Sequence, residues 1–211
     1  IVHTAAASNL GQMLQKICLA DGVPLVNIVR SEEQAAILRG IGATHVLNSR
    51  DADFRKRLVD AIAETGATVA FDAIGGGTLG SDVVQAMEQA AARTMTEFSR
   101  YGSNSFKQLY IYGALDTAPT TLNRLAFGFQ WSVSGWLLTP FMQKAGGEIV
   151  GRMRQRVVDE LTTTFASHYT ATIGLAEALK FDADGIGGSA PVLVAKFSSD
   201  VDLQADDFKI I

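Results

Sequence analysis

Short apolar runs alternate with amphipathic segments along most of the chain. The runs are rich in β-branched residues and have the length of strands that are buried on both faces of a sheet. Between them, apolar positions recur every three or four residues, as in helices that pack on a sheet. The predicted strands are Ile1–Thr4, Leu25–Val29, His45–Leu47, Thr68–Ile74, Leu109–Gly113, Ser132–Leu138 and Pro191–Phe197.

Helices are predicted between these strands. Ser31 is a predicted N-cap with Gln34 at the capping-box position, and Asp51 or Asp53 is expected to cap the next helix. The helical patterns cover residues 13–18, 31–40, 54–62, 78–95, 148–165 and 175–179. Strands that alternate with helices predict an α/β fold. The sheet is expected to be doubly wound and parallel, with about six strands and helices on both faces.

The domain boundaries follow from the same pattern. Residues 1–190 are expected to form one domain, and residues 191–211 a closing strand with a C-terminal tail. The least regular segment, residues 93–107, is expected to be a surface loop or an extension of the preceding helix. Because the first residue is not Met and lies inside a predicted strand, we expect the chain to be an excised domain of a longer protein.

Composition narrows the function classes. Hydrophobic residues make up 47% of the chain and charged residues 19%, which is ordinary for a globular protein. The net charge of -4 gives no electrostatic reason to expect a nucleic acid or an anionic membrane as partner. No apolar run approaches the roughly 20 residues of a membrane span. Cys18 is the sole cysteine, so no disulfide can form within the chain, which favours a reducing, cytoplasmic setting.

The first strand, its turn and the following helix form a candidate dinucleotide site. A tight turn of small residues at a helix N-terminus can present backbone amides to a pyrophosphate. Residues 6–11 align with the G-x-G-x-x-G fingerprint, of which only Gly11 is kept. The amides of Ser8, Asn9 and Leu10 are the predicted phosphate donors. The alternative is a strand-to-helix turn in an α/β protein that binds no nucleotide.

The end of the second strand bears on which nucleotide would bind. An NAD site usually has an acidic residue there, which binds the ribose 2′-hydroxyl. Arg30 and Ser31 occupy this place instead. A guanidinium and a hydroxyl suit a 2′-phosphate, which predicts NADP, with NAD as the alternative cofactor. Taken by itself, Arg30 could equally be a solvated side chain beside an N-cap serine.

Glycines follow two later strands. Gly75–Gly77 and Gly113 lie where open α/β sheets bind ligands, so backbone without side chains there could let a cofactor lie close. The alternative is turn glycine, which is the commoner use. Asp72 is interpreted as a cap of the turn rather than a ribose ligand.

Several segments together carry a family resemblance. They are residues 5–11, 29–34, 38–48, 69–76, 111–115 and 132–138, in the correct order. The combination resembles the cofactor domain of the medium-chain dehydrogenase/reductase superfamily, nearest to its quinone oxidoreductase-like and zinc-type alcohol dehydrogenase-like members. The resemblance implies a six-stranded Rossmann sheet and hydride transfer between a nicotinamide and a ketone, aldehyde, quinone or enone. It also implies homodimers formed edge to edge through residues 132–138.

The resemblance completes the list of candidate cofactor residues. They are Ser8, Asn9, Leu10, Gly11, Arg30, Ser31, Arg50, Ile74, Gly75, Gly113, Ala114 and Leu115. The GroES-like substrate domain that precedes this domain in the family is absent from the sequence, and with it the main source of zinc ligands. His3, His45 and His168 show no ligand spacing, so we expect no zinc here. Catalytic residues and the parent's small-molecule substrate stay unassigned, and alone the chain is expected to turn over little.

Three other readings stay open. A short-chain dehydrogenase would need a Tyr-x-x-x-Lys pair, and Tyr101 with Lys107 has the wrong spacing. A Rossmann methyltransferase usually has an acidic residue where Arg30 lies. The third reading is a non-catalytic module for nucleotide sensing or dimerisation, with a fingerprint that no longer binds tightly.

Overall fold

The computed structural model describes residues 1–167, together with the backbone of residues 172–173 and 194–195. The chain divides into two compact units, residues 1–166 and 167–211. The assignment of residues 1–190 to one domain stays a prediction. Among the described residues, no helix is both long and apolar enough to span a membrane. The predicted cytoplasmic location is untested.

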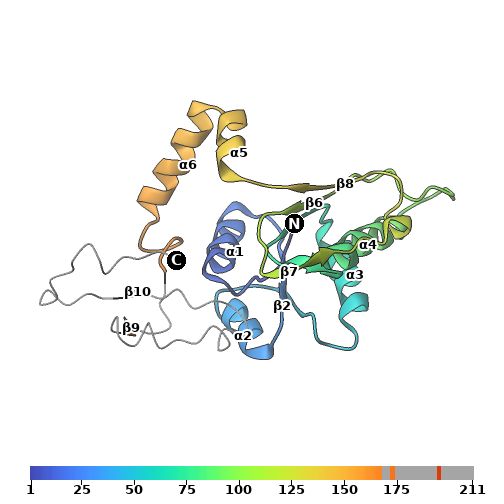
Figure 1. Cartoon of the computed structure of the whole chain (residues 1–211), viewed down its shortest axis with the longest axis horizontal. Helices are drawn as coiled ribbons and strands as arrows, with labels where there is room; N and C mark the ends of the chain where they lie inside the picture. The colour runs from blue at the N-terminus through green and yellow to red at the C-terminus, as the bar shows by residue number, and fades with distance from the viewer. Residues whose placement is uncertain (168–171, 174–193, 196–211) are drawn as a thin grey trace, which may run out of the picture. The chain divides into compact units, whose positions relative to one another are not determined.

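A six-stranded parallel sheet forms the centre of the first unit, with the strand order β3-β2-β1-β4-β6-β8 (Figure 1). In this order β1 lies in the middle. Strands β2 and β3 follow on one side of it and β4, β6 and β8 on the other, as in a doubly wound fold. The predicted α/β class and number of strands are therefore confirmed. The strands are β1 (Val2–His3), β2 (Val26–Val29), β3 (His45–Asn48), β4 (Val69–Asp72), β6 (Lys107–Ile111) and β8 (Trp131–Gly135).

Helices cover both faces of the sheet, with α1 and α2 on one side and α3 and α4 on the other (Figure 1). The larger core cluster joins α3 and α4 to the sheet through side chains such as Leu58, Val83 and Leu109, and the smaller one packs Leu38 of α2 against Val46. The helices are α1 (Asn9–Asp21), α2 (Glu32–Gly40), α3 (Phe54–Thr65), α4 (Leu79–Ala92), α5 (Leu138–Ala145) and α6 (Gly147–Asp159).

Several predicted boundaries are corrected. The strand predicted over 132–138 ends at Gly135, because its partner β6 ends at Ile111, which pairs with Gly135. The helix predicted over 78–95 ends at Ala92, and residues 93–106 are loop. The helix predicted over 148–165 ends at Asp159. The predicted carboxylate cap of α3 is absent, since the N-cap residue Asp53 makes no side-chain cap hydrogen bond.

A helix and two short strands of this unit were not predicted. Helix α5 follows β8 directly. A short strand β5 (Gly75–Gly77) pairs in parallel with β7 (Asp116–Thr120), beyond the carboxyl ends of β4 and β6. Apolar periodicity did not reveal β5 and β7, because one is entirely glycine and the other is exposed along its whole length.

The predicted C-terminal strand lies mostly outside the described residues. Within it, β10 (Val194–Ala195) pairs in parallel with β9 (Thr172–Ile173) in a separate two-stranded sheet. The helical turn expected at residues 175–179 lies outside the described residues. At the edge of the large sheet, β8 pairs with β6 alone, so homodimerisation through residues 132–138 stays a prediction.

Candidate cofactor site

Parallel strands bring most of the candidate residues to one edge of the sheet. Residues 8–11 follow β1, residues 30–31 follow β2, and Arg50 follows β3. Ile74 and Gly75 follow β4, and residues 113–115 follow β6. These are all carboxyl ends of strands, the edge at which open α/β sheets bind ligands. The topology therefore collects the predicted residues, although they are dispersed along the sequence.

The turn after β1 depends on Gly11. Ala5 has a left-handed φ of 49°, and the Ala6 amide donates to the Ile28 carbonyl at 3.1 Å, which holds the turn against β2. A Cβ built on Gly11 would lie 2.6 Å from the carbonyl carbon of Ala6 and closer still to its oxygen. The retained glycine of the fingerprint is thus required because helix and turn backbones are in contact.

Not all of the predicted phosphate donors are available. The Ser8 amide donates to the Ala5 carbonyl at 3.0 Å, and the Gly11 amide donates to the Ser8 hydroxyl at 3.2 Å. Within the described part of the chain, the amides of Asn9 and Leu10 have no acceptor. They begin a helix of 13 residues, whose N-terminal dipole favours an anion. Asn9 and Leu10 are therefore the stronger candidates for phosphate binding.

Arg30 and Ser31 have different roles at the end of β2. The Ser31 hydroxyl accepts from the Gln34 amide at 3.3 Å, and the Gln34 side chain accepts from the Arg30 amide at 2.9 Å. This confirms Ser31 as the N-cap of α2. The Ser31 hydroxyl also holds the pKa of the Glu33 carboxyl below its usual range. Ser31 is thus already engaged, and Arg30 is left as the stronger candidate for a 2′-phosphate.

Arg30 and Arg50 are exposed cations without a carboxylate partner in residues 1–167. Most other arginines of this unit form ion pairs, as Arg55 does with Asp82 at 3.1 Å. The amide of Arg50 donates to the Asn48 side chain at 3.0 Å, which fixes its backbone and leaves the guanidinium available. Unpaired guanidiniums at this edge fit an anionic group.

Asp72 organises the exit of β4. Its carboxylate accepts from the Thr4 hydroxyl at 2.6 Å, from the Ile74 amide at 2.9 Å and from the Gly75 amide at 3.1 Å. The Thr4 hydroxyl in turn accepts from the Ala73 amide at 2.9 Å. The interpretation of Asp72 as a turn cap is confirmed, and the same bonds connect β1 to the turn that carries Ile74.

Close backbone contacts require glycine at positions 75 and 113. Gly75 has a φ of 80°, and a Cβ on it would lie 2.7 Å from the Gly113 carbonyl oxygen. A Cβ on Gly113 would lie 2.5 Å from the Ala73 carbonyl oxygen. Ala114 and Leu115 are exposed beside them. The two exits are therefore packed together for structural reasons, and their contact with a cofactor stays a prediction.

Two stacked rings, buried His3 and half-buried Tyr112, connect β1 to the residue that follows β6. His3 Nε2 and the Tyr112 hydroxyl are hydrogen-bonded at 2.7 Å, and the rings stack with an interplanar angle of 6°. Burial lowers the pKa of His3 to about 4. Burial, with a smaller effect of the Asp72 carboxylate, raises the pKa of Tyr112 to about 12. Both rings are therefore neutral at pH 7, and His3 is a core residue.

The His3 pKa predicts a pH dependence of stability. Between the ordinary value of 6.5 and the folded value of about 4, the unfolded chain binds a proton that the folded chain does not. The contribution of His3 is thus complete above pH 6.5 and is lost as the pH falls toward 4. Urea unfolding from pH 7 to 4 should show a smaller decline in free energy for His3→Gln than for the unsubstituted chain, and parallel declines would contradict this.

One cleft of about 470 Å³ lies at the carboxyl edge, between the connections that follow β3 and β4. Of the candidate residues only Ile74 lines it, together with Asp51, Asp82 and Asp116. Its three carboxylates outnumber its single arginine, Arg55, which is paired with Asp82, so the cleft is a poor phosphate site. Among the described residues no three His, Cys, Asp or Glu side chains group as a metal site, and His168 lies outside them.

Comparisons with known proteins agree with this geometry. The sequence profile of the zinc-binding dehydrogenase family matches residues 10–109. Together with the strand order, this match makes the chain similar to the cofactor-binding domains of medium-chain dehydrogenase/reductase oxidoreductases. No curated protein sequence matches the chain.

Solved structures match the fold over most of the chain. A Mesorhizobium loti protein assigned as an NADPH:quinone reductase is 28% identical with a TM-score of 0.67, over 85% of this chain and 48% of that one. A Bacillus thuringiensis protein with the same assignment is 15% identical with a TM-score of 0.61, over 84% and 49%. An Etr1p mutant in complex with NADP and crotonyl-CoA is 17% identical with a TM-score of 0.59, over 82% and 45%. Etr1p is part of a 2-enoyl thioester reductase of Candida tropicalis. The chain spans about half the length of these proteins.

Proposed function

We propose that the chain is the NADP(H)-binding domain of an oxidoreductase. The observation that carries the proposal is Arg30, an exposed guanidinium with no carboxylate partner in the described part of the chain, at the end of β2. An acidic residue in this position would bind a ribose hydroxyl and repel a 2′-phosphate, whereas a guanidinium attracts it.

Different residues of the site would bind the pyrophosphate and the 2′-phosphate. The amides of Asn9 and Leu10 would donate to the pyrophosphate, and Gly11 keeps the turn close enough for α1 to present them. Arg30, assisted by Arg50, would hold the 2′-phosphate. The bound cofactor supplies the hydride, and the protein supplies binding and orientation.

The proposed substrate is a carbonyl, quinone or enone compound, bound in a longer protein of which this domain is a part. The proposal is supported by the quinone reductase assignment of the 28% identical relative and by the crotonyl-CoA complex of Etr1p. Because the chain spans about half of those proteins, we expect it to bind cofactor and to show little turnover alone.

Replacement of Arg30 tests the proposal. Arg30→Gln should weaken NADPH binding by about tenfold or more, because a hydrogen bond to a charged group contributes about 1.5–3 kcal/mol. NADH lacks the 2′-phosphate, so its affinity should not change. Isothermal titration of both cofactors into the unsubstituted chain and the variant measures the two affinities.

Arg154→Gln provides the matched control. Arg154 is an exposed arginine in α6, likewise without an ion pair in the described residues. Two residues further along α6, Arg156 pairs with Asp21, at the opposite end of α1 from the candidate phosphate donors. This variant should bind NADPH like the unsubstituted chain. An absence of heat with either cofactor would refute the proposed function, and a preference for NADH would refute the role of Arg30.

A further inference from the structure

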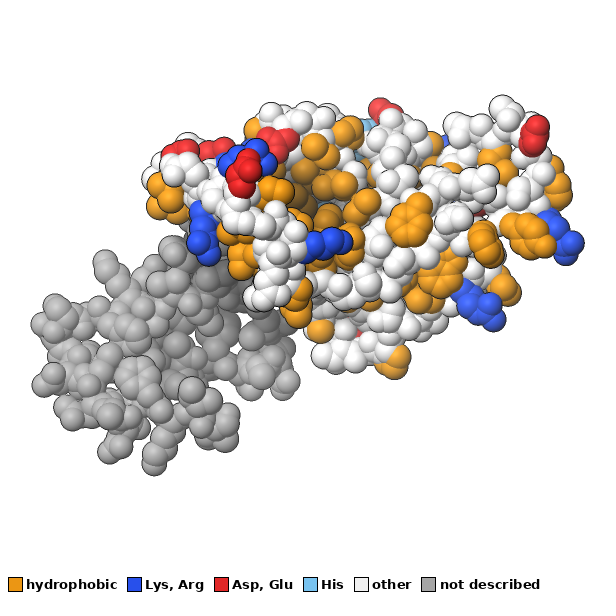
Figure 2. Space-filling view, turned by 90° about the horizontal axis from the view of Figure 1, so that it is seen from above, with side chains coloured by type: hydrophobic (Ala, Val, Ile, Leu, Met, Phe, Trp, Pro, Cys, Tyr) orange, Lys and Arg blue, Asp and Glu red, His pale blue; other side chains and the backbone are white. Residues whose placement is uncertain are grey.

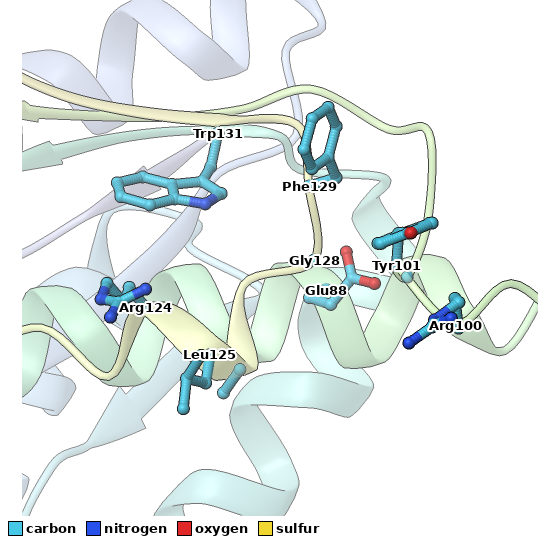
Figure 3. Close-up of a pocket in the computed structure, with 10 residues that line it drawn as sticks. Glu88, Arg100, Tyr101, Arg124, Leu125, Gly128, Phe129 and Trp131 are labelled. Carbon is cyan, nitrogen blue, oxygen red and sulfur yellow. The ribbon is translucent and has the colours of Figure 1, made fainter.

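A second cleft lies at the edge of the sheet opposite the candidate cofactor site. It measures about 660 Å³ and is lined by residues that precede β6 and β8, with Glu88 from the last turns of α4. Figure 3 shows Arg124 and Leu125 at one end, Tyr101 and Arg100 at the other, and the Glu88 carboxylate between them. Its size is that of a small-molecule site.

The floor of the cleft is a fixed polar cluster. Lys107 is fully buried, and its Nζ lies 2.6 Å from the Glu88 carboxylate. Glu88 also accepts from the Ser103 amide at 2.7 Å and from the Ser103 hydroxyl at 2.6 Å. Burial alone would raise the pKa of Glu88, but the bonds from Lys107 and Ser103 lower it below its usual range. The Glu88 charge is therefore balanced within the protein.

Two glycines hold this floor in place. Gly102 has a φ of 86° and Gly128 a φ of 69°, which favours glycine at both positions. A Cβ on Gly102 would lie 2.5 Å from a Glu88 carboxylate oxygen, and one on Gly128 would lie 2.6 Å from its carboxyl carbon. Both loops thus approach Glu88 through bare backbone, and the cleft is shaped by packing rather than by loosely arranged loops.

The walls are aromatic and largely accessible. Tyr101 and Phe129 are 65% and 72% exposed, and their rings meet with centroids 6.3 Å apart. Trp131 lines the same cleft, and its ring packs edge-on against buried Phe127 at 5.2 Å. On the face seen in Figure 2, hydrophobic and basic side chains lie next to one another at the end that carries these loops. Such walls suit a flat apolar group.

The two arginines of the cleft are uncompensated. Neither Arg100 nor Arg124 has a carboxylate partner within residues 1–167, and Arg100 lies 5.4 Å from the centre of the Tyr101 ring. The acidic side chain that lines the cleft, Glu88, is already paired with Lys107. The cleft therefore carries an excess of positive charge over aromatic surface.

We propose that this cleft binds a small organic anion with a flat, aromatic body. Arg100 or Arg124, at the two ends of the cleft, would hold the anionic group, and Tyr101, Phe129 and Trp131 would provide the surface on which the ring packs. The site is separate from the nucleotide site, because the two lie at opposite edges of the sheet, and the proposal does not rest on the proposed function.

Naphthalene-2-sulfonate is a suitable probe, with naphthalene-2-methanol as its uncharged counterpart. In ¹⁵N-edited NMR titrations of the whole chain, the sulfonate should shift the amides of residues 100–102 and 124–131. The methanol should bind at least tenfold more weakly. The double variant R100Q/R124Q should weaken sulfonate binding by tenfold or more, and R154Q should leave it unchanged.

A second comparison separates the cleft from the nucleotide site. Saturating NADPH and the R30Q variant should both leave the sulfonate affinity unchanged. Equal affinities for the two probes, no shifts at millimolar sulfonate, or shifts at the carboxyl edge that NADPH abolishes would each overturn the proposal. Because both cleft arginines are at the surface, the melting temperature of the double variant should match that of the unsubstituted chain.

Discussion

Replacing Gly11 with alanine is expected to lower the free energy of unfolding by about 3 kcal/mol or more, the upper range for overpacking. The new Cβ would lie 2.6 Å from the carbonyl carbon of Ala6 and 2.8 Å from its Cα. These are backbone atoms, so α1 would have to move away from the turn. Urea unfolding followed by circular dichroism measures the loss.

Gly151→Ala is the matched control for this substitution. Gly151 also lies within a helix, α6, and no heavy atom lies within 4 Å of a Cβ built there. Alanine should be neutral at this position or stabilise α6 by up to about 1 kcal/mol. If Gly11→Ala were as well tolerated as Gly151→Ala, the contact between helix and turn would not be essential.

Replacing Lys107 with methionine is the second change with a large expected effect. Removing one partner of a buried ion pair typically costs about 3–5 kcal/mol, because the remaining charge is left buried without compensation. Lys107 is fully buried and donates to the Ser105 carbonyl at 2.6 Å besides its pairing with Glu88. Chemical denaturation of K107M at pH 7 should show this loss.

A double variant distinguishes the effect of the unpaired Glu88 charge from the effect of lost packing at Lys107. E88Q/K107M removes the stranded charge and keeps one acceptor oxygen for Ser103, so it should be more stable than K107M alone. Lys56→Met, which removes an exposed partner of Asp60, should cause no measurable change. A double variant as unstable as K107M would show that lost packing, rather than the unpaired carboxylate, causes the effect.

The sequence predicted the large sheet well, because local periodicity determines which segments become strands and helices. Residues 25–29 and 45–47 are short apolar runs between capping signals, and they form the inner strand β2 and the edge strand β3. Strand β8 was predicted three residues too long, since its end depends on where β6 stops. The predicted strand also took in Leu138, the first residue of α5, and that helix was missed.

The site was predictable where its contacts are local. Ser31 and the Gln34 amide that it caps are three positions apart, and the Asp72 carboxylate caps the turn immediately after it. The pairing of His3 with Tyr112 spans 109 residues and could not be read from spacing. The floor of the second cleft was missed for the same reason, although Lys107, a charge at the head of an apolar strand, was a signal for a buried partner.

The central claim is that the start of α1 and Arg30 together bind NADP. A crystal structure of the chain with saturating NADP⁺ tests it most directly. We predict the pyrophosphate within hydrogen-bond distance of the Asn9 and Leu10 amides, and the 2′-phosphate beside the Arg30 guanidinium. A nucleotide bound elsewhere, or an α1 turn that stays empty at saturating NADP⁺, would contradict the account.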